Sequence, residues 1–133
     1  MAKQYYIHNI DFATLGIRTL NYYNTSNTTI ESATYSALKS DTITTHGGGL
    51  LIFGYVYGTV TSGIAYLYAK VDNTEYKLGQ INNAATNLQG IYYVPPLTAG
   101  SHTVSFGVTR QDGTGRTFTI PGYSINQVQF IEC

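Results

Sequence analysis

The side chains best suited to chemistry in this 133-residue sequence are three histidines, seven acidic residues and one cysteine. The histidines, His8, His46 and His102, are far apart in the chain, and the cysteine is the last residue, Cys133. A zinc site needs three or four His, Cys or carboxylate ligands, which are often close in sequence. The sequence therefore predicts no metal site and no cofactor, and it lacks the His/Glu cluster of a small cupin-type enzyme.

Arrangements typical of other catalytic sites are also missing from the sequence. No Gly-x-Ser-x-Gly turn presents a nucleophilic serine, and Gly47-Gly48-Gly49 lacks the Lys-Ser/Thr ending of a phosphate-binding loop. A glycosidase needs two carboxylates close together, but most acidic residues here fall at expected turns or strand ends, where acidic side chains commonly bond the backbone. We therefore predict that the protein is not an enzyme and has no catalytic residues.

Tyrosine is the unusual feature of the composition. The chain has thirteen Tyr, five Phe and no Trp, and its formal net charge is zero. Tyrosine combines a large apolar contact area with a polar tip, which suits partly buried interfaces, and a neutral surface lacks the repulsion that keeps monomers apart. The seven basic residues are spread along the chain rather than clustered, which argues against nucleic-acid binding.

The sequence gives no indication of a membrane protein. No apolar run approaches the roughly 18–20 residues of a membrane-spanning helix, and residues 1–6 contain no apolar signal-peptide core. A single terminal cysteine forms no internal disulfide. We therefore expect synthesis in the cytoplasm and no membrane insertion.

Alternation of apolar and polar residues, which indicates β-strands, is much commoner here than helical spacing. Strands are expected at 30–40, 41–45, 50–60, 64–71, 75–79, 91–94, 101–110, 116–120 and 123–132, with hairpins around 61–63 and 112–115, and the best helix candidate is the short segment 81–89. Turn signals at spacings of about 8–12 residues are typical of sandwiches and jelly rolls. The sequence thus predicts an all-β, antiparallel, jelly-roll-type β-sandwich of about 8–10 strands.

Two neighbouring strands contain paired tyrosines. Tyr55 and Tyr57 are two residues apart, as are Tyr66 and Tyr68, so each pair shares one face of its strand. In a hairpin that turns at residues 61–63, the four rings would form one aromatic patch. This patch predicts a contact between subunits, a cover over the sandwich core, or a water-facing surface in which tyrosine only supports the strand.

The chain divides into two segments by pattern. Residues 1–29 resemble an extended N-terminal arm, in which irregularly spaced apolar residues precede a polar tract of Asn, Thr and Ser. Residues 30–133 form the expected jelly-roll domain. The arm either docks on another protein or forms an edge strand on its own domain.

Four stretches between residues 42 and 133 give the chain a resemblance to a known group of proteins. They are a strand that enters a glycine turn at 42–48, a strand at 66–71 that runs into Asp72-Asn73, a proline loop and strand at 96–106, and a last strand that ends near Glu132. They resemble the small jelly-roll domains of bacteriophage tail fibres and virion surfaces, which are similar in architecture to the tumour-necrosis-factor and complement globular-head group. The resemblance implies a compact homotrimer with inner-sheet aromatics near the threefold axis, and the four paired tyrosines fit that position.

The resemblance also implies a function. We expect a non-enzymatic phage virion structural protein on the virion surface, a trimeric jelly roll that acts as capsid or tail decoration or as a fibre head. Residues 1–29 would attach it to other virion proteins. The alternative is a monomeric lectin-like carbohydrate-binding or adhesion module unrelated to phage.

A host-surface glycan is a further expected partner, because rings stack on sugar faces while amides bond sugar hydroxyls. The candidate ligand-binding residues are Asn82, Asn83, Asn87, Tyr92 and Tyr93. The sequence leaves open the choice between decoration and receptor binding and the identity of any ligand.

Overall fold

A computed structural model of the chain describes residues 16–83, 86–111 and 116–133. In this part of the chain there are ten β-strands and no helix, and therefore no helix that could span a bilayer. The strands are β1 (Ile17–Tyr22), β2 (Thr28–Ile30), β3 (Lys39–Thr45), β4 (Leu50–Val60), β5 (Ile64–Val71), β6 (Thr74–Asn82), β7 (Thr86–Val94), β8 (Gly100–Arg110), β9 (Phe118–Ile120) and β10 (Asn126–Glu132). The predicted all-β class is confirmed.

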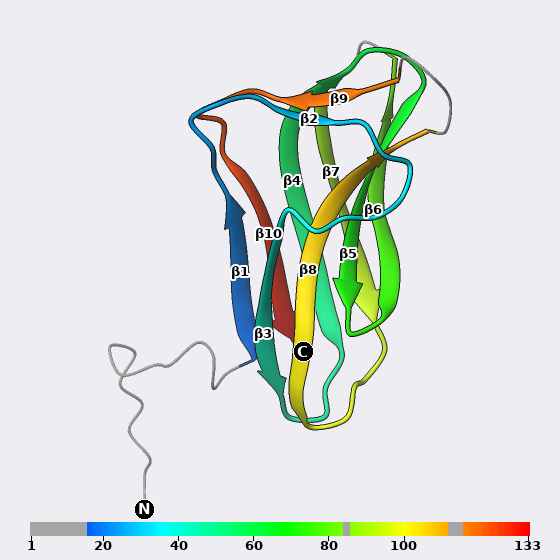
Figure 1. Ribbon diagram of the computed structural model, residues 1–133. Helices are drawn as coiled ribbons and strands as arrows, with labels where there is room; N and C mark the ends of the chain where they lie inside the picture. The colour runs from blue at the N-terminus through cyan, green and yellow to red at the C-terminus, as the bar shows by residue number, and fades with distance from the viewer. Residues whose placement is uncertain (1–15, 84–85, 112–115) are drawn as a thin grey trace, which may run out of the picture.

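The strands form two antiparallel sheets packed face to face (Figure 1). The larger sheet has six strands in the order β1-β10-β4-β9-β2, and β7 also pairs with β4. The smaller sheet, which lies in front in Figure 1, has the order β3-β8-β5-β6. Because β3, β4 and β5 alternate between the sheets, the chain winds around the core, which confirms the jelly-roll-type sandwich.

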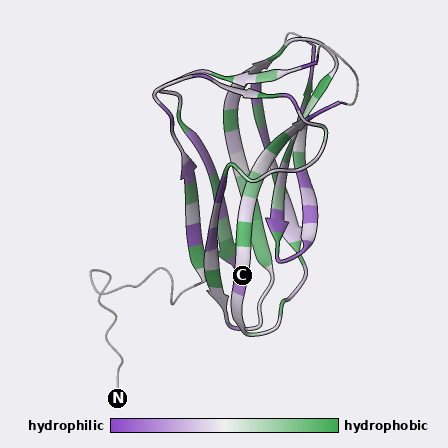
Figure 2. Ribbon diagram, in the orientation of Figure 1, coloured by the Kyte–Doolittle hydropathy of each residue, from purple (hydrophilic) through white to green (hydrophobic). Residues whose placement is uncertain are grey.

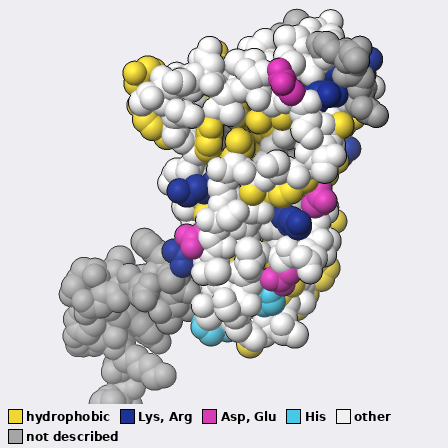
Figure 3. Space-filling model, in the orientation of Figure 1, with side chains coloured by type: hydrophobic (Ala, Val, Ile, Leu, Met, Phe, Trp, Pro, Cys, Tyr) yellow, Lys and Arg dark blue, Asp and Glu magenta, His cyan; other side chains and the backbone are white. Residues whose placement is uncertain are grey.

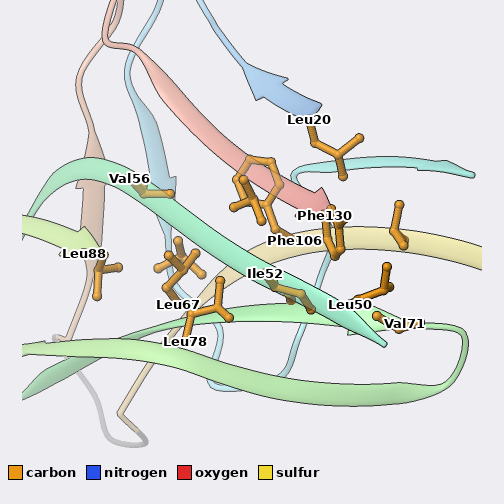
Figure 4. Close-up of a cluster of buried hydrophobic side chains, with 14 of the residues drawn as sticks. Leu20, Leu50, Ile52, Val56, Leu67, Val71, Leu78, Leu88, Phe106 and Phe130 are labelled. Atoms are coloured by element: carbon orange, nitrogen blue, oxygen red, sulfur yellow. The ribbon is translucent and has the colours of Figure 1, made fainter. Parts of the chain in front are cut away.

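The core lies between the sheets and follows directly from the alternation in the sequence. Hydrophobic and hydrophilic residues alternate along several strands (Figure 2), and β5 buries every second residue. Phe106 of the smaller sheet and Phe130 of the larger one are fully buried and point into the same cluster (Figure 4). Burial of one such side chain stabilises the fold by about 1.5–3 kcal/mol relative to exposure.

Strands β6 and β7 join the two sheets along one edge of the sandwich. A Cβ on Gly90 would collide with the carbonyl oxygen of Leu78, and one on Gly79 would collide with that of Gln89, so only glycine permits this approach. The helix candidate at 81–89 is wrong, because Leu88 is buried at strand spacing within β7.

Two predicted hairpins are also wrong. β4 and β5 occupy the predicted ranges, but β4 pairs with β7, β9 and β10, whereas β5 pairs with β6 and β8. The turn at 61–63 therefore carries the chain from one sheet to the other. Likewise β8 and β9 belong to different sheets, and the loop 112–115 between them lies outside the described residues. The expected strand at 30–40 is mostly irregular chain between β2 and β3.

The described part of the predicted arm is built into the sandwich. β1 pairs with β10 along its full length, from Ile17 opposite Ile131 to Tyr22 opposite Asn126, and β2 pairs with β9. This agrees with the edge-strand alternative, and the predicted boundary after residue 29 falls inside β2. Residues 1–15, which include His8, lie outside the described residues, so attachment through that segment stays a prediction.

Candidate functional site

The outward face of the larger sheet presents large apolar side chains. Those at alternate positions of β4 and β7 are Leu51, Phe53, Tyr55, Tyr57, Ile91 and Tyr93. The register places Leu51 beside Tyr93 and Phe53 beside Ile91, and the Leu51 row continues across β10 and β1 through Ile131 and Ile17. Such cross-strand neighbours contact one another on the sheet surface. We refer to the side chains of these two rows (Leu51, Tyr93, Ile131 and Ile17; Phe53 and Ile91) as the apolar rows.

These rows are open to solvent mainly along β7 and at Phe53. Ile91 is 61% exposed and Tyr93 is 52% exposed, whereas Leu51, Ile131 and Ile17 are half-buried. Along β1, β10, β4 and β7, as far as the structure describes them, no outward position has a charged side chain. A contiguous exposed apolar patch in a protein of this size marks an interaction surface.

The outward face of the smaller sheet is different, and it contains the other two predicted interface tyrosines. Tyr66 and Tyr68 stand here, with ring centroids 6.2 Å apart, because β5 and β4 lie in different sheets. The ammonium group of Lys77 lies 5.6 Å from the Tyr66 ring centroid. Figure 3 looks onto this side and shows basic and acidic side chains scattered over it. The predicted patch of four tyrosines is thus two separate pairs on opposite faces.

A hollow of about 620 Å³ lies on the larger sheet next to the apolar rows. Tyr55 and Tyr57 of β4 line one side of it, and residues 121–125, the loop between β9 and β10, line the other. The Tyr55 hydroxyl donates to Oδ1 of Asn87 at 3.2 Å. The lining residues are all uncharged, so the hollow suits a neutral occupant.

The loop 121–125 is held by the neighbouring segment that follows β1. The backbone N–H of Tyr123 donates to the Asn24 carbonyl at 2.7 Å, and that of Gly122 donates to Asn27 Oδ1 at 2.9 Å. Tyr123 has a φ of +66°, a left-handed conformation that bulky residues seldom adopt. Its ring contacts Tyr23 edge to face, with centroids 6.1 Å apart. Strained residues of this kind cluster at functional sites.

Asn126 ties this loop to the sheet from inside. Its side chain is buried, and its Oδ1 accepts from the Tyr57 N–H at 2.9 Å. Its Nδ2 donates to Ser124 Oγ at 3.1 Å and to the Tyr22 carbonyl at 3.2 Å. One amide therefore orients β1, β4 and the loop together.

Sequence reasoning missed the loop side of the hollow. The sequence pattern assigns Tyr123 and Ile125 to the expected strand 123–132, but β10 begins only at Asn126, and in the loop before it these side chains are 68% and 75% exposed. The available signal was their position directly after Pro121-Gly122, a pair that favours a turn. Two such side chains beside a turn, rather than inside a strand, indicate a surface with a function.

The structure does not bring the predicted ligand-binding residues together. These are Asn82, Asn83, Asn87, Tyr92 and Tyr93. The asparagines lie near the β6–β7 connection and the tyrosines near the opposite end of β7. Tyr92 is five positions beyond Asn87, which corresponds to about 17 Å of strand. The set therefore does not form one site.

Each of these residues nevertheless has a defined place. Tyr93 belongs to the apolar rows, whereas Tyr92 packs on Tyr76 of β6 with ring centroids 4.9 Å apart. Asn87 reaches the hollow through its bond with Tyr55. Asn82 is exposed at the end of β6 and Asn83 just beyond it.

Two histidine–carboxylate pairs lie at the other end of the sandwich, where Figure 3 shows the histidines. In the first, His46 Nδ1 is 3.0 Å from Glu132 Oε1, and Glu132 Oε2 accepts the backbone N–H groups of His46 and Gly48 at 2.7 Å each. Burial alone would raise the pKa of Glu132, but these hydrogen bonds lower it below its usual value. The pair fastens the end of β10 to the β3–β4 loop.

In the second pair, His102 Nδ1 lies 2.7 Å from Asp72 Oδ2, and Nε2 lies 2.7 Å from the Thr98 carbonyl oxygen. Both partners are acceptors, so the arrangement is satisfied fully only by the doubly protonated imidazolium. The bonds to Asp72 and then to Thr98 raise the pKa of His102, and the bond from His102 lowers the pKa of Asp72.

No group of three or more metal-ligating side chains is found within residues 16–83, 86–111 and 116–133. The histidines of this part of the chain, His46 and His102, are bound to single carboxylates. Both pairs connect loops at one end of the sandwich, which is a structural arrangement.

No protein-family model matches the sequence, and no curated protein is significantly similar to it. Among solved structures, the chain is similar to Eiger, a TNF from S. frugiperda, with a TM-score of 0.54 and 9% identity over 89% of this chain and 93% of that chain. It also aligns with a chain of the T13 IBDV viral particle (TM-score 0.46, 9% identity, 87% of this chain and 35% of that one). A mutant VP2 protein of infectious bursal disease virus aligns with a TM-score of 0.46 and 12% identity over 87% of this chain and 35% of that one. The fold is therefore a TNF-like jelly roll, and at these identities the likeness concerns the fold alone.

Proposed function

We propose that this chain is a non-enzymatic structural module that assembles with copies of itself through the apolar rows. The observation that carries this proposal is the exposed, uncharged surface around Phe53, Ile91 and Tyr93 on one sheet face. When two such surfaces meet, apolar area leaves water at about 25 cal/mol per Å², and no charge has to be desolvated. A chain with no net charge also has little long-range repulsion to overcome.

The assembly we propose is a homotrimer displayed on a bacteriophage virion, as capsid or tail decoration or as a fibre head. The support is the resemblance of residues 42–133 to such domains, together with the jelly-roll fold. The chain segment that precedes β1 would attach it to other virion proteins, and the protein would reach the virion surface after synthesis in the host cytoplasm. A glycan of the host surface is the further partner in this proposal.

Absence of catalysis is part of the proposal. The support is that His46 and His102 are engaged with carboxylates at the end of the sandwich away from the hollow. The hollow itself is lined by Tyr, Pro, Gly, Ser and Ile, a set that contains no carboxylate, imidazole, amine or thiol.

A second candidate is a monomeric lectin-like carbohydrate-binding or adhesion module unrelated to phage. The observation that favours it is the tyrosine-lined hollow on an otherwise uncharged face. The two candidates differ in oligomeric state, which is simple to measure.

The test is the solution mass of the full chain by light scattering on a size-exclusion column. We expect about three times the 14.6 kDa of one chain, and we expect Ile91→Glu to give monomers, because it places a charge in the contact. Tyr66→Glu is the matched control on the opposite face, next to Lys77, and should stay trimeric. A clean monomer for the unmodified chain would contradict the assembly and favour the lectin-like candidate.

A further inference from the structure

We infer that the hollow between β4 and the loop 121–125 binds a neutral sugar unit of a glycan. The inference rests on the glycan-binding part of the proposed function and is independent of the assembly part. It assigns the ligand to Tyr57 and Tyr123, with Tyr55 and Asn87 at the margin, rather than to the β6–β7 connection.

The aromatic rings supply the surface that a sugar needs. Tyr57 is 39% exposed and Tyr123 is 68% exposed, and they stand on opposite sides of the hollow. The C–H face of a pyranose is apolar and packs flat on an aromatic ring. Two rings on different elements can contact a single ring-sized ligand or two consecutive sugar units.

The hydroxyl groups of these rings have unused hydrogen-bonding capacity. The Tyr55 hydroxyl is held by Asn87, but in residues 16–83, 86–111 and 116–133 those of Tyr57 and Tyr123 bond to no protein group. A phenol both donates and accepts, so each can exchange a bond to water for one to a sugar hydroxyl. The uncharged lining offers no counter-charge to an acidic sugar, which favours a neutral one.

The loop side of the hollow is ordered before any ligand arrives. Tyr123 is held in its left-handed conformation by the bond of its N–H to Asn24, and Ser124 is held by Asn126. Binding therefore requires no further loss of conformational entropy in this segment, and this raises the affinity for a given contact area.

The hollow borders the apolar rows at Tyr55, which is two residues from Phe53 on β4, but its stacking ring Tyr57 lies further along the strand. Tyr57 is four residues from Phe53 and six from Leu51 on β4, which corresponds to about 13 and 20 Å. If a second copy covered the hollow, the two free hydroxyls would be buried, and each would cost about 1–3 kcal/mol without a partner. A sugar supplies those partners, so it fits the hollow better than an apolar protein surface does.

The experiment measures binding of neutral oligosaccharides of glucose, galactose, mannose and N-acetylglucosamine to the full chain. Saturation-transfer NMR and calorimetry at millimolar sugar are the readouts. We expect at least one of these sugars to bind, and we expect Tyr57→Ala and Tyr123→Ala each to weaken its affinity about tenfold, because a stacked ring is lost. Tyr57→Phe keeps the ring and should weaken binding only about threefold.

The controls are Tyr93→Ala in the apolar rows and Tyr66→Ala on the opposite face, and both should bind sugar as the unmodified chain does. The inference is overturned if no oligosaccharide binds, or if Tyr93→Ala weakens binding as much as Tyr57→Ala. It is also overturned if Tyr57→Ala lowers the solution mass and leaves sugar binding unchanged, since the hollow would then belong to the contact between copies. Sugar binding by a monomeric protein would support the inference while contradicting the proposed assembly.

Discussion

The two sheets are alike in their inward faces, which are apolar and buried, but their outward faces differ in charge. Each buries alternate residues in the common core, but the outward face of the smaller sheet includes Lys70, Glu75 and Lys77. The described outward positions on the long strands of the larger sheet are uncharged and include the exposed Phe53 and Ile91. An exposed apolar face without charge is typical of interaction surfaces, so the difference supports the proposal that the larger sheet provides the contact between copies.

The tyrosines show the same contrast. Tyr35, in the segment between β2 and β3, lies against the smaller sheet: its hydroxyl and Ser105 Oγ are hydrogen-bonded at 2.6 Å, and the ammonium group of Lys70 lies 5.6 Å from its ring centroid. This tyrosine is satisfied within the chain. On the larger sheet, the rings of Tyr57 and Tyr123 are exposed, and within residues 16–83, 86–111 and 116–133 their hydroxyls bond to no protein group, so one tyrosine stabilises the fold while others remain available for binding.

The largest loss of unfolding free energy is expected for a variant at the contact between β6 and β7, where the two sheets are joined. Gly90→Ala would force β6 and β7 apart, because its Cβ collides with the Leu78 carbonyl, and we expect a loss of about 3 kcal/mol or more in unfolding free energy. Gly47→Ala is the control, since its Cβ would meet nothing within 4 Å and only its φ of +95° is unfavourable, at about 1 kcal/mol. Urea unfolding measures both, and equal losses would show that the sheets are not joined at this edge.

The next largest loss of unfolding free energy is expected for variants that remove a buried side-chain hydrogen bond. One such variant is chosen on each sheet. Asn126→Ala removes the partner of the Tyr57 N–H and frees the loop 121–125, which should cost about 1–3 kcal/mol. Ser105→Ala removes the hydrogen bond between the Ser105 and Tyr35 hydroxyls and should cost about 1 kcal/mol. The same urea measurements decide the order. A smaller loss for Asn126→Ala than for Ser105→Ala would mean that the loop beside the hollow is not held by this amide.

A smaller and pH-dependent effect is expected at the end of the sandwich that both sheets share. The raised pKa of His102 adds stability that is full below about 6.5 and is lost as pH rises through the folded value. The lowered pKa of Asp72 adds stability that is full above about 4 and is lost as pH falls through its folded value. The His102–Asp72 pair therefore stabilises the folded chain most between about pH 4 and about pH 6.5.

Asp72→Asn tests this pair. Asparagine tolerates the φ of +52° at this position, so the backbone is preserved, and we expect a lower Tm at about pH 5.5 and little change at about pH 8.5. Asp41→Asn is the control, because Asp41 is exposed and forms its ion pair with Arg18 at 3.8 Å rather than with a histidine. A Tm difference that is the same at both pH values would contradict the pairing of His102 with Asp72.

The smallest change in unfolding free energy is expected for substitutions of exposed tyrosines on the outward faces of the two sheets. Tyr66→Ser and Tyr93→Ser should each change the unfolding free energy by at most about 0.5 kcal/mol at low protein concentration. The comparison is sharpened at high concentration, where only Tyr93→Ser should lower the Tm, because it weakens the contact that stabilises assembled chains. Equal behaviour of the two variants at all concentrations would remove the distinction between the faces.

Much of the fold could be predicted from local pattern. The ranges of β4 and β5 match the predicted segments, and alternate residues of the expected strand 101–110, namely Val104, Phe106 and Val108, are buried. The partners of β4 and β5 could not be predicted, because a strand that alternates correctly can pair with any other such strand. The hairpin and the four-tyrosine patch failed for this reason.

The candidate site shows the same limit. Tyr55 and Tyr57 were recognised as neighbours on one strand, but the loop that faces them comes from residues 121–125, more than sixty positions later in the sequence. Its position depends on the bonds of Asn126 to β1 and β4, which exist only after β1, β4 and β10 are paired.

The sequence by itself therefore determined the class of structure, the inward set of residues and the scarcity of charge. These follow from local periodicity and composition, which act over a few residues. The tertiary structure alone decided which strands share a sheet, and hence that Tyr55 and Tyr57 face away from Tyr66 and Tyr68. It also placed the loop 121–125 against β4, because the pairing of distant strands is set by how one common core is filled and not by the pattern of any single strand.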